Sequence, residues 1–358
     1  MTRLFEPLQI KDITLRNRIA VSPMCQYSSV DGYPNDWHLV HLGSRAVGGA
    51  GLVVMEATAV SPDGRISTAD SGIYYDDHVE PFAKIARFIK QQGSVAGIQI
   101  AHAGRKASTN KPWEGNDQIG HDQGGWDTIA PSAIAFGGKL DKVPTEMTLD
   151  DIRRVQADFV SAARRAVAAG FECLEIHFAH GYLAHEFYSP LSNKRMDQYG
   201  GSFENRIRFL LETFTAVREV WPVRLPLIVR LSVTDWVEGG VTIDESIELI
   251  RQLKAAGLDM IDVSHGMVTP NEKVPWAPGM MIAHAGRIRR EVDIAATTSW
   301  FITNPKQAED ALLAGHLDVV MLARELLRDP YWPYHAAKEL GDKALQNILP
   351  VQYARAVE

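Results

Sequence analysis

The sequence predicts an α/β protein that folds as a single-domain (β/α)8 TIM barrel. Short apolar runs rich in β-branched residues alternate eight times with amphipathic helical patterns. Such alternation favours a closed barrel of parallel strands over a doubly wound sheet. Polar residues also follow several of these runs, at the positions where a barrel gathers its functional groups. No linker-like stretch divides the chain, so we expect one domain over residues 1–358.

The predicted strands are short, and all but the last end in a polar or small residue. In order along the chain they are Ile19–Ser22, Leu52–Ala57, Gly97–Ala101, Cys173–His177, Leu227–Ser232, Met260–Ser264, Ala295–Ser299 and Asp318–Leu322. Side chains alternate between the two faces of a strand, so Cys173, Glu175 and His177 share one face. The same alternation places Arg230 inside the barrel. An arginine there needs either a salt bridge or another electron-rich partner, and the strand alone does not decide between them.

The predicted helices show apolar stripes at helical spacing. They are Trp37–Val47, Val79–Gln91, Leu149–Ala169, Phe203–Val220, Ile243–Ala256, Ile282–Glu291, Pro305–Ala314 and Trp332–Leu340. In the third of these, Ile152, Val155 and Phe159 lie on one stripe. Thr242 and Glu245 have the spacing of a capping box at the start of the fifth. Glycines follow several helices shortly before the next strand, as helix-ending glycines do.

One connection is much longer than the others. About 47 residues, 102–148, separate the third strand from its helix and are rich in Gly, Pro, Trp and Asp. A loop of this length in a compact domain is usually functional. We therefore expect residues 102–148 to form a lid over the site, the alternative being a solvated insertion with a small hairpin.

Composition narrows the function class. The formal net charge is −7, which argues against a nucleic-acid-binding protein. The two cysteines, Cys25 and Cys173, are too few for a disulfide scaffold or a four-cysteine cluster and fit a reducing compartment. We find neither a signal-peptide pattern nor an apolar run of about 18 residues. The expectation is a cytoplasmic enzyme without membrane or nucleic-acid partners.

His177, His180 and Tyr182 lie within six positions at the end of the fourth strand and the start of its loop. The His-x-x-His spacing admits a metal site, with Glu175 on the same strand face as a third ligand. A metal-dependent hydrolase is therefore an alternative from the spacing alone. A lone histidine in a loop is more often a surface or core residue, but two histidines and a tyrosine at the end of a barrel strand favour a functional role.

Several motifs together resemble the Old Yellow Enzyme family of flavin-dependent ene-reductases. They are Ser22–Tyr27 (SPMCQY), His177–Leu183 (HFAHGYL), Ser189–Asn193 (SPLSN), Asp197, Tyr199–Ser202 (YGGS), Asn205–Arg206 and Arg324–Pro330 (RELLRDP). The resemblance runs from Leu4 almost to the C-terminus. Cys25, His180 and the Gln352–Arg355 tail are similar to the thermophilic-like branch. The iron–sulfur dienoyl-CoA reductases, a related barrel chemistry, would need four cysteines.

The resemblance implies non-covalent FMN at the barrel mouth, reduced by NADPH or NADH. An alkene conjugated to a carbonyl or nitro group then enters the same site. The residues it assigns to the isoalloxazine ring are Ser22, Pro23, Met24, Cys25, Ala57, Gln99 and Arg230. Those it places around the ribityl phosphate are Trp300, Phe301, Ile302, Thr303, Ala323 and Arg324. Arginine near the flavin would stabilise its reduced, anionic form.

The resemblance also implies the substrate contacts. His177 and His180 would donate hydrogen bonds to the activating oxygen, Tyr182 would protonate Cα, and Tyr27 and Trp300 would shape the pocket. Residues 345–358 would contact a neighbouring subunit of a homodimer or homotetramer, with Arg355 entering the adjacent site. Two donors aimed at an oxygen that gains charge stabilise the transition state more than the ground state.

The sequence departs from the family pattern in two loops. Relatives commonly carry glycines in the loop after the seventh strand and just before the arginine after the eighth. This chain has Trp300–Thr303 and Ala323 there. These positions lie where backbone N–H groups would approach a phosphate, and bulkier residues change what the loop backbone can adopt.

Overall fold

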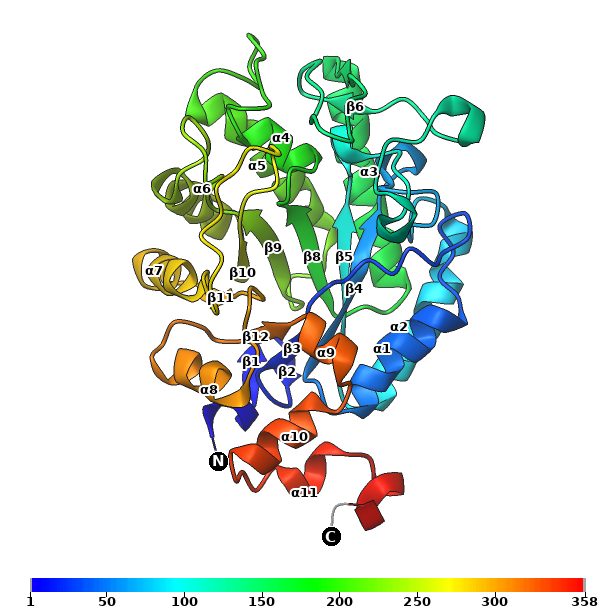
Figure 1. Cartoon of the computed structure of the whole chain (residues 1–358). Coiled ribbons are helices and arrows are strands. Elements are labelled where there is room, and N and C mark those ends of the chain that lie inside the picture. The colour runs from blue at the N-terminus through cyan, green and yellow to red at the C-terminus, as the bar shows by residue number, and fades with distance from the viewer. Residues whose placement is uncertain (1, 357–358) are drawn as a thin grey trace.

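Eight parallel strands form a barrel in the computed structural model, which describes residues 2–356 (Figure 1). Their order around the sheet is β11 (Ala295–Thr297), β10 (Met260–Ser264), β9 (Leu227–Ser232), β8 (Cys173–Phe178), β5 (Val95–Ala101), β4 (Leu52–Ala59), β3 (Ile19–Val21) and β12 (Val320–Leu322). The two ends of this order meet where the Asp318 N–H donates to the Ala296 carbonyl, at 2.9 Å. The predicted (β/α)8 barrel is confirmed.

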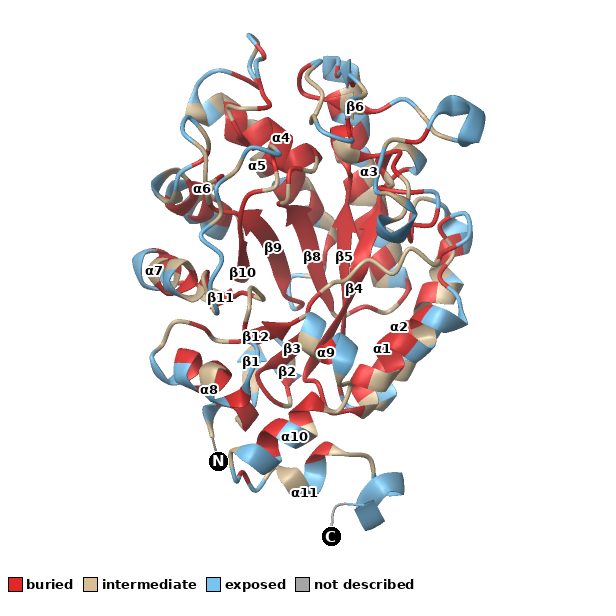
Figure 2. Ribbon diagram, in the orientation of Figure 1, coloured by how far each residue is buried: buried red, intermediate tan, exposed pale blue. Residues whose placement is uncertain are grey.

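Helices surround the strands and bury their apolar stripes against them (Figure 2). They are α1 (Asp36–Val47), α2 (Val79–Gln91), α3 (Leu149–Ala168), α5 (Phe203–Val220), α6 (Ile243–Ala255), α7 (Ile282–Val292), α8 (Pro305–Leu313) and α10 (Trp332–Glu339). In α3 the predicted stripe is buried. Thr242 and Glu245 form the predicted capping box at the start of α6.

The interior face of the strands follows the predicted alternation. Cys173 belongs to a buried cluster inside the barrel with Leu52, Val54 and Ile228, whereas Leu174 packs in the outer core beneath the helices. A hairpin of β1 (Leu8–Ile10) and β2 (Ile13–Leu15) covers this inner cluster. We did not predict this hairpin. It closes one end of the barrel, so a functional site can open only at the opposite end, where the strands have their C-termini.

Several short elements were also missed. They are the helices α4 (Leu183–Tyr188), α9 (Arg324–Arg328) and α11 (Leu345–Ile348), and the 3-10 turns η1 (Arg3–Phe5), η2 (Pro62–Gly64), η3 (Asp76–His78), η4 (Gly104–Lys106), η5 (Pro112–Glu114), η6 (His121–Gln123) and η7 (Val351–Ala356). The seventh strand ends at Thr297, so Ser299 lies in the following loop and not in the strand as predicted.

Residues 102–148 follow β5 and lie above the barrel beside α3 and α4 (Figure 1). They contain a small parallel pair, β6 (Ile129–Ala130) with β7 (Thr145–Glu146), where the alternative interpretation expected a hairpin. Trp113 of this segment meets Tyr27 edge to face, with ring centroids 5.9 Å apart. Across residues 2–356, no helix is both long enough and apolar enough to cross a bilayer.

Candidate active site

The end of β8 brings three predicted site residues together. The ring centroid of His177 lies 4.9 Å from that of His180 and 5.0 Å from that of Tyr182, each pair edge to face. Nδ1 of His177 accepts the Ala179 N–H at 3.1 Å, which leaves Nε2 as the nitrogen that carries the proton. Burial, reinforced by nearby positive charge, lowers the pKa of both imidazoles well below its ordinary value. Both are therefore neutral near pH 7.

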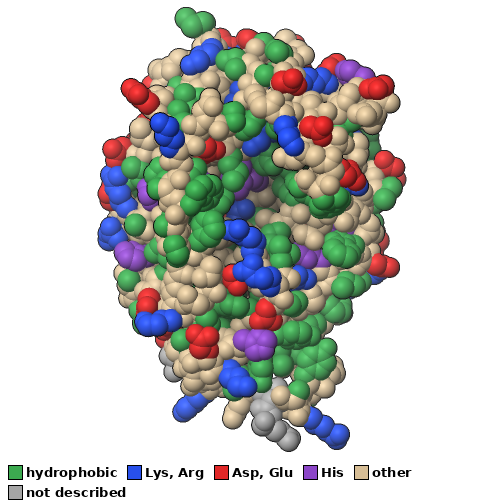
Figure 3. Space-filling view, viewed as in Figure 1, with side chains coloured by type: hydrophobic (Ala, Val, Ile, Leu, Met, Phe, Trp, Pro, Cys, Tyr) green, Lys and Arg blue, Asp and Glu red, His purple; other side chains and the backbone are tan. Residues whose placement is uncertain are grey.

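A cavity of about 550 Å³ opens beside this group. The hollow at the centre of the space-filling view has basic side chains along its lower edge and histidine inside it (Figure 3). The cavity is lined by Ser22, Pro23, Arg230, Trp276, Ser299, Trp300, Phe301, Ala323 and Arg324. Its volume is in the range of small-molecule and cofactor sites. Residues from the ends of β3, β9, β11 and β12 thus meet at one mouth, as predicted.

Arg230 is both a cavity wall and part of a buried ion-pair network. Its guanidinium pairs with Asp262, lies 3.7 Å from Glu175 and donates to Ser22 Oγ at 2.7 Å. Gln99 donates to the same Glu175 carboxylate. Burial opposes the charge of Arg230, but the two carboxylates offset it and raise the pKa of the arginine. The salt-bridge interpretation is therefore confirmed, and Arg230 still faces the cavity.

The loop after β8 turns through two residues with left-handed backbone. His180 has φ +60° and Gly181 has φ +69°. A Cβ on Gly181 would lie 2.0 Å from the Met267 carbonyl oxygen, so only glycine fits there. The His180 N–H donates to Ser232 Oγ at 2.9 Å, which ties this turn to the end of β9.

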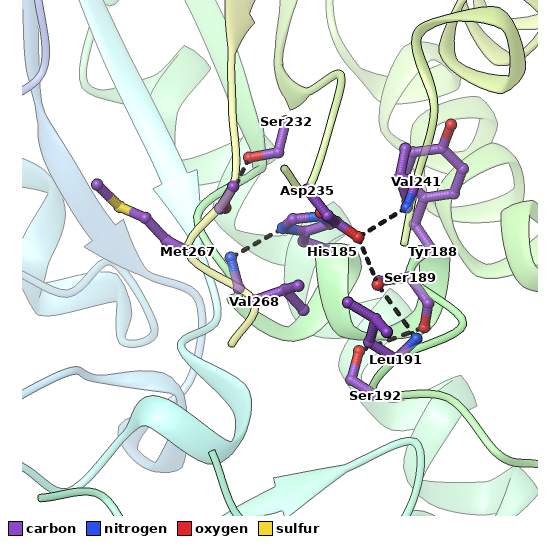
Figure 4. A network of polar contacts seen from close by, with 12 residues as sticks. His185, Tyr188, Ser189, Leu191, Ser192, Ser232, Asp235, Val241, Met267 and Val268 are labelled. Atoms are coloured by element: carbon purple, nitrogen blue, oxygen red, sulfur yellow. Dashed lines mark hydrogen bonds and ion pairs between the residues drawn. The ribbon is translucent and has the colours of Figure 1, made fainter. Parts of the chain in front are cut away.

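A buried polar network holds the other side of the turn (Figure 4). The Gly181 N–H donates to Nδ1 of His185 at 2.9 Å, and Nε2 of His185 donates to Asp235 at 2.9 Å. The Asp235 carboxylate also accepts hydrogen bonds from Ser189 Oγ at 2.7 Å and from the Val241 N–H at 2.8 Å. Sequence reasoning missed this network. The residue that could have revealed it is His185, which lies one helical turn after Tyr182.

Lys106 is a further residue at the mouth that was not predicted. Its ammonium donates to the carbonyls of His180 and Met267 at 2.7 and 3.0 Å and lies 5.2 Å from the centre of the Tyr182 ring. Burial lowers the pKa of Lys106 from 10.5 to about 8. The first turn of the 102–148 segment thereby anchors the loop that carries the site.

The other residues predicted for the site lie beside the cavity or in the core next to it. Cys25, Tyr27 and Tyr182 pack against a small apolar cluster formed by Ile66, Ala103 and Ala107. Burial raises the pKa of the Cys25 thiol well above its ordinary value, so it is uncharged. Ala57 lies at a bulge of β4 and shares a tight pocket with Tyr182, while Met24 packs on the main core.

The two divergent loops come together beside the cavity. Ile302, Thr303, Ala323 and Arg324 line a second hollow of about 240 Å³ that shares Ser299, Phe301, Ala323 and Arg324 with the first. The Arg324 guanidinium lies over the Phe301 ring, 4.6 Å from its centre. Arg355 is exposed in η7, far along the chain from the other site residues.

The Asp235 carboxylate generates a prediction about stability. Burial alone would raise its pKa, but His185 and three hydrogen bonds lower it below the ordinary 3.8. A lowered pKa means that the carboxylate stabilises the fold above pH 3.8 and that this stabilisation is lost as pH falls through the folded-state pKa. Asp235→Asn should therefore cost roughly 1–3 kcal/mol at pH 7, because the amide NH2 cannot accept a hydrogen bond and leaves a buried donor unsatisfied.

Urea unfolding at pH 7 and at pH 3 measures this cost. The gap between wild type and Asp235→Asn should be largest at pH 7 and narrower at pH 3. Asp150→Asn, which removes one partner of an exposed ion pair with Arg153, is the matched control and should change little. An equal gap at both pH values would contradict the assignment.

Comparison with known proteins identifies the family to which this barrel and its site belong. The family model described as NADH:flavin oxidoreductase / NADH oxidase matches residues 3–343. NADPH dehydrogenases of Geobacillus sp. (strain WCH70) and Bacillus subtilis (strain 168) are 47% and 44% identical to the chain. Each alignment covers 99% of this chain and 98% of the relative.

Among solved structures, morphinone reductase in complex with tetrahydroNAD has a TM-score of 0.79 at 26% identity, covering 94% of this chain and 90% of that one. The old yellow enzyme homologue from Zymomonas mobilis also has a TM-score of 0.79 at 26% identity, covering 94% and 92%. The chain therefore belongs to the NADH:flavin oxidoreductase / NADH oxidase family, the Old Yellow Enzymes, and is an FMN-dependent oxidoreductase.

Proposed function

We propose that the protein is an ene-reductase that uses NADPH to saturate the C=C bond of α,β-unsaturated carbonyl and nitro compounds. The observation that carries the proposal is the group of two neutral imidazoles and one phenol at the end of β8, beside the cavity. FMN would supply the redox chemistry, taking a hydride from the nicotinamide and giving it to the β carbon of the alkene. The protein groups bind and polarise the alkene and deliver the proton.

The cavity fits FMN at both of its charged regions. Arg230 lies on one wall, where it would face the flavin ring together with Ser22 to Cys25, Ala57 and Gln99. Arg324 lies at the other end, and within residues 2–356 its guanidinium pairs with no carboxylate. An unpaired cation next to a polar hollow is suited to a phosphate. We assign Trp300 to Thr303, Ala323 and Arg324 to the ribityl phosphate.

Phe301 keeps the conformation that a glycine would adopt in this loop. Its φ is +54°, in the left-handed region that non-glycine residues rarely occupy. The ring turns away to lie over Arg324, and the Trp300 ring packs 4.2 Å from that of His265. The side chains of Trp300 and Phe301 therefore leave the loop backbone in a conformation that glycine would also adopt. This supports the proposal that the loop binds the phosphate.

His177 and His180 would donate hydrogen bonds to the carbonyl or nitro oxygen. Negative charge builds on that oxygen as the β carbon accepts the hydride, so preorganised donors lower the barrier. Tyr27 and Trp113 would close the substrate side of the pocket, with residues 102–148 as its lid.

Tyr182 would give its hydroxyl proton to the α carbon. Burial, followed by the nearby Cys25 and Asp70, raises the pKa of Tyr182 well above 10, so the phenol stays protonated at neutral pH. The new C–H bond at Cα completes the saturated product, and the phenolate then recovers a proton from water.

The metal-hydrolase alternative required a third ligand beside the two histidines. Glu175, the residue considered for this role, instead accepts a hydrogen bond from Gln99 and pairs with Arg230. Membership of a flavin oxidoreductase family assigns the chain to redox chemistry and replaces that alternative.

We further propose that the protein is a homodimer or homotetramer whose C-terminal tail enters a neighbouring site. In Figure 1 the tail leaves the molecule beyond α10 and α11, and Arg355 is exposed there. Residues 357–358, also assigned to this tail, lie outside the described residues. Arg355→Ala should raise the KM for the alkene about tenfold without changing the flavin content, because a charged hydrogen bond is worth about 1.5 kcal/mol.

Steady-state kinetics at increasing alkene concentrations measures that KM. Sedimentation velocity reports the oligomeric state. Arg290→Ala, an exposed arginine of α7, is the control. A monomeric wild type with full activity would refute a role for Arg355 in a neighbouring site.

Arg324→Ala should weaken FMN binding by about ten- to a hundredfold, since charge-assisted hydrogen bonds are worth about 1.5–3 kcal/mol. Fluorescence titration of deflavinated protein with FMN measures the Kd, and Arg290→Ala again provides the control. Riboflavin, which lacks the phosphate, should bind wild type and Arg324→Ala equally. A phosphate-independent loss would place Arg324 elsewhere.

Tyr182→Phe should slow re-oxidation of the reduced enzyme by cyclohexenone, with flavin reduction by NADPH nearly unchanged, because only the second half-reaction needs a proton at Cα. Anaerobic stopped-flow measurement of both half-reactions separates the two steps. Tyr75→Phe, at an exposed tyrosine, is the control. An equal fall in both half-reactions would contradict the acid role.

The overall proposal is tested by an anaerobic screen of enones, maleimides and nitroalkenes against the NADPH-reduced, flavin-loaded protein. Rapid re-oxidation by several of these compounds is expected. A reduced flavin that none of them re-oxidises would refute the ene-reductase assignment while leaving family membership intact.

A further inference from the structure

A hydrogen-bond chain through the buried Ser264 connects Trp300 to one of the two site histidines. The Trp300 indole nitrogen lies 2.8 Å from Ser264 Oγ, and the same oxygen lies 2.6 Å from Nε2 of His180. Ser264 ends β10 and is 2% exposed, and both contacts are partly buried at the edge of the cavity. Trp300 stands in the loop that follows β11.

The direction of each hydrogen bond follows from the chemistry of the groups. An indole nitrogen can only donate, so Ser264 Oγ accepts from Trp300. The single hydroxyl proton of Ser264 is then directed at Nε2 of His180, which accepts it only when unprotonated. His180 is neutral, because burial and the nearby positive groups disfavour the imidazolium form. Its one proton therefore lies on Nδ1.

The opposite arrangement is less stable. If Nε2 of His180 carried the proton and donated to Ser264, the serine oxygen would accept twice. Its own hydroxyl proton would then lack an acceptor among the described residues, and a buried unpaired donor is costly. His177 differs, since the backbone N–H of Ala179 alone fixes its proton on Nε2.

We propose that Trp300 is a positioning residue that, through Ser264, fixes His180 in the tautomer with its proton on Nδ1. Nδ1 of His180 forms no hydrogen bond with any described residue, so it is free to donate to a substrate oxygen. The two imidazoles then offer one N–H each, from different ring nitrogens. This inference rests on the proposed function only for the role of the donor; the tautomer itself is a property of the protein.

The tautomer is read directly by nuclear magnetic resonance. Flavin-loaded protein labelled with ring-15N histidine gives long-range 1H–15N correlations in which protonated and unprotonated ring nitrogens are distinct, and His180→Asn assigns the signals. In wild type, Nδ1 of His180 should be protonated and Nε2 unprotonated. Trp300→Phe frees Ser264 Oγ to accept from Nε2, so the variant should populate the other tautomer.

Ser264→Ala removes the link itself and should also change the His180 pattern, which keeps the test valid if one variant folds poorly. Trp37→Phe is the matched control, because it deletes an indole N–H that donates to Gln26 at 3.1 Å on the surface. The His177 signals should stay the same in every variant.

Kinetics supplies the second measurement. Re-oxidation of the reduced enzyme by cyclohexenone should slow about two- to tenfold in Trp300→Phe, because the rate scales with the fraction of molecules in the donating tautomer. Complete loss of such a donor typically costs about 10²–10³. The deficit should persist at saturating cyclohexenone, because the hydrogen bond from His180 strengthens mainly as charge builds on the substrate oxygen in the transition state.

The outcomes separate the two ideas. Protonation of Nε2 in wild-type His180, or an unchanged His180 pattern in both Trp300→Phe and Ser264→Ala, would overturn the inference. The expected tautomers together with no re-oxidation by any alkene would refute the ene-reductase proposal and leave the Trp300–Ser264–His180 chain intact.

Discussion

The site depends on the turn at His180 and Gly181, because His177 packs against it and Tyr182 directly follows it. The turn uses two successive left-handed residues, a conformation that a free chain rarely adopts. It is held by hydrogen bonds from both of its N–H groups and to the His180 carbonyl. The partners are Ser232 from β9, His185 from α4 and Lys106 from the start of the 102–148 segment. Three elements far apart in the sequence thus determine where the imidazole and phenol rings lie.

The barrel interior supports this turn with a polar layer directly beneath the mouth. Gln99, Glu175, Arg230 and Asp262 come from four neighbouring strands and contact one another, although one oxygen of each carboxylate has no hydrogen-bond partner among the described residues. Burial raises the pKa of Glu175, and the charge of Arg230 opposes that shift. Because the arginine is held by carboxylates below, its remaining face is fixed toward the cavity. A buried cation is thereby offered to a ligand without moving on binding.

The barrel and the gathering of strand-end residues could be predicted from the sequence, because both follow from local periodicity. Two-residue alternation correctly placed Arg230 and His177 inside, and the capping pair at Thr242 was readable from spacing. The partners of these groups could not be predicted from the sequence. Asp262 and Glu175 on Arg230, Asp235 on His185 and Ser264 on Trp300 are contacts between elements whose register no local pattern specifies. Short helices such as α4 were missed for the same reason, since tertiary packing stabilises them more than their own sequence does.

The 102–148 segment is attached to the site unevenly. Its first turn is built into the mouth, where Arg105 donates to the Val268 carbonyl and Lys106 to that of His180. Its outer part reaches the pocket where Trp113 meets Tyr27 edge to face and where Trp126 packs on the same apolar cluster as Tyr182. Loop exchange between relatives would therefore be best confined to the outer part, beyond Ser108. A graft there would replace the outer surface of the segment while leaving in place the hydrogen bonds that Arg105 and Lys106 make at the mouth.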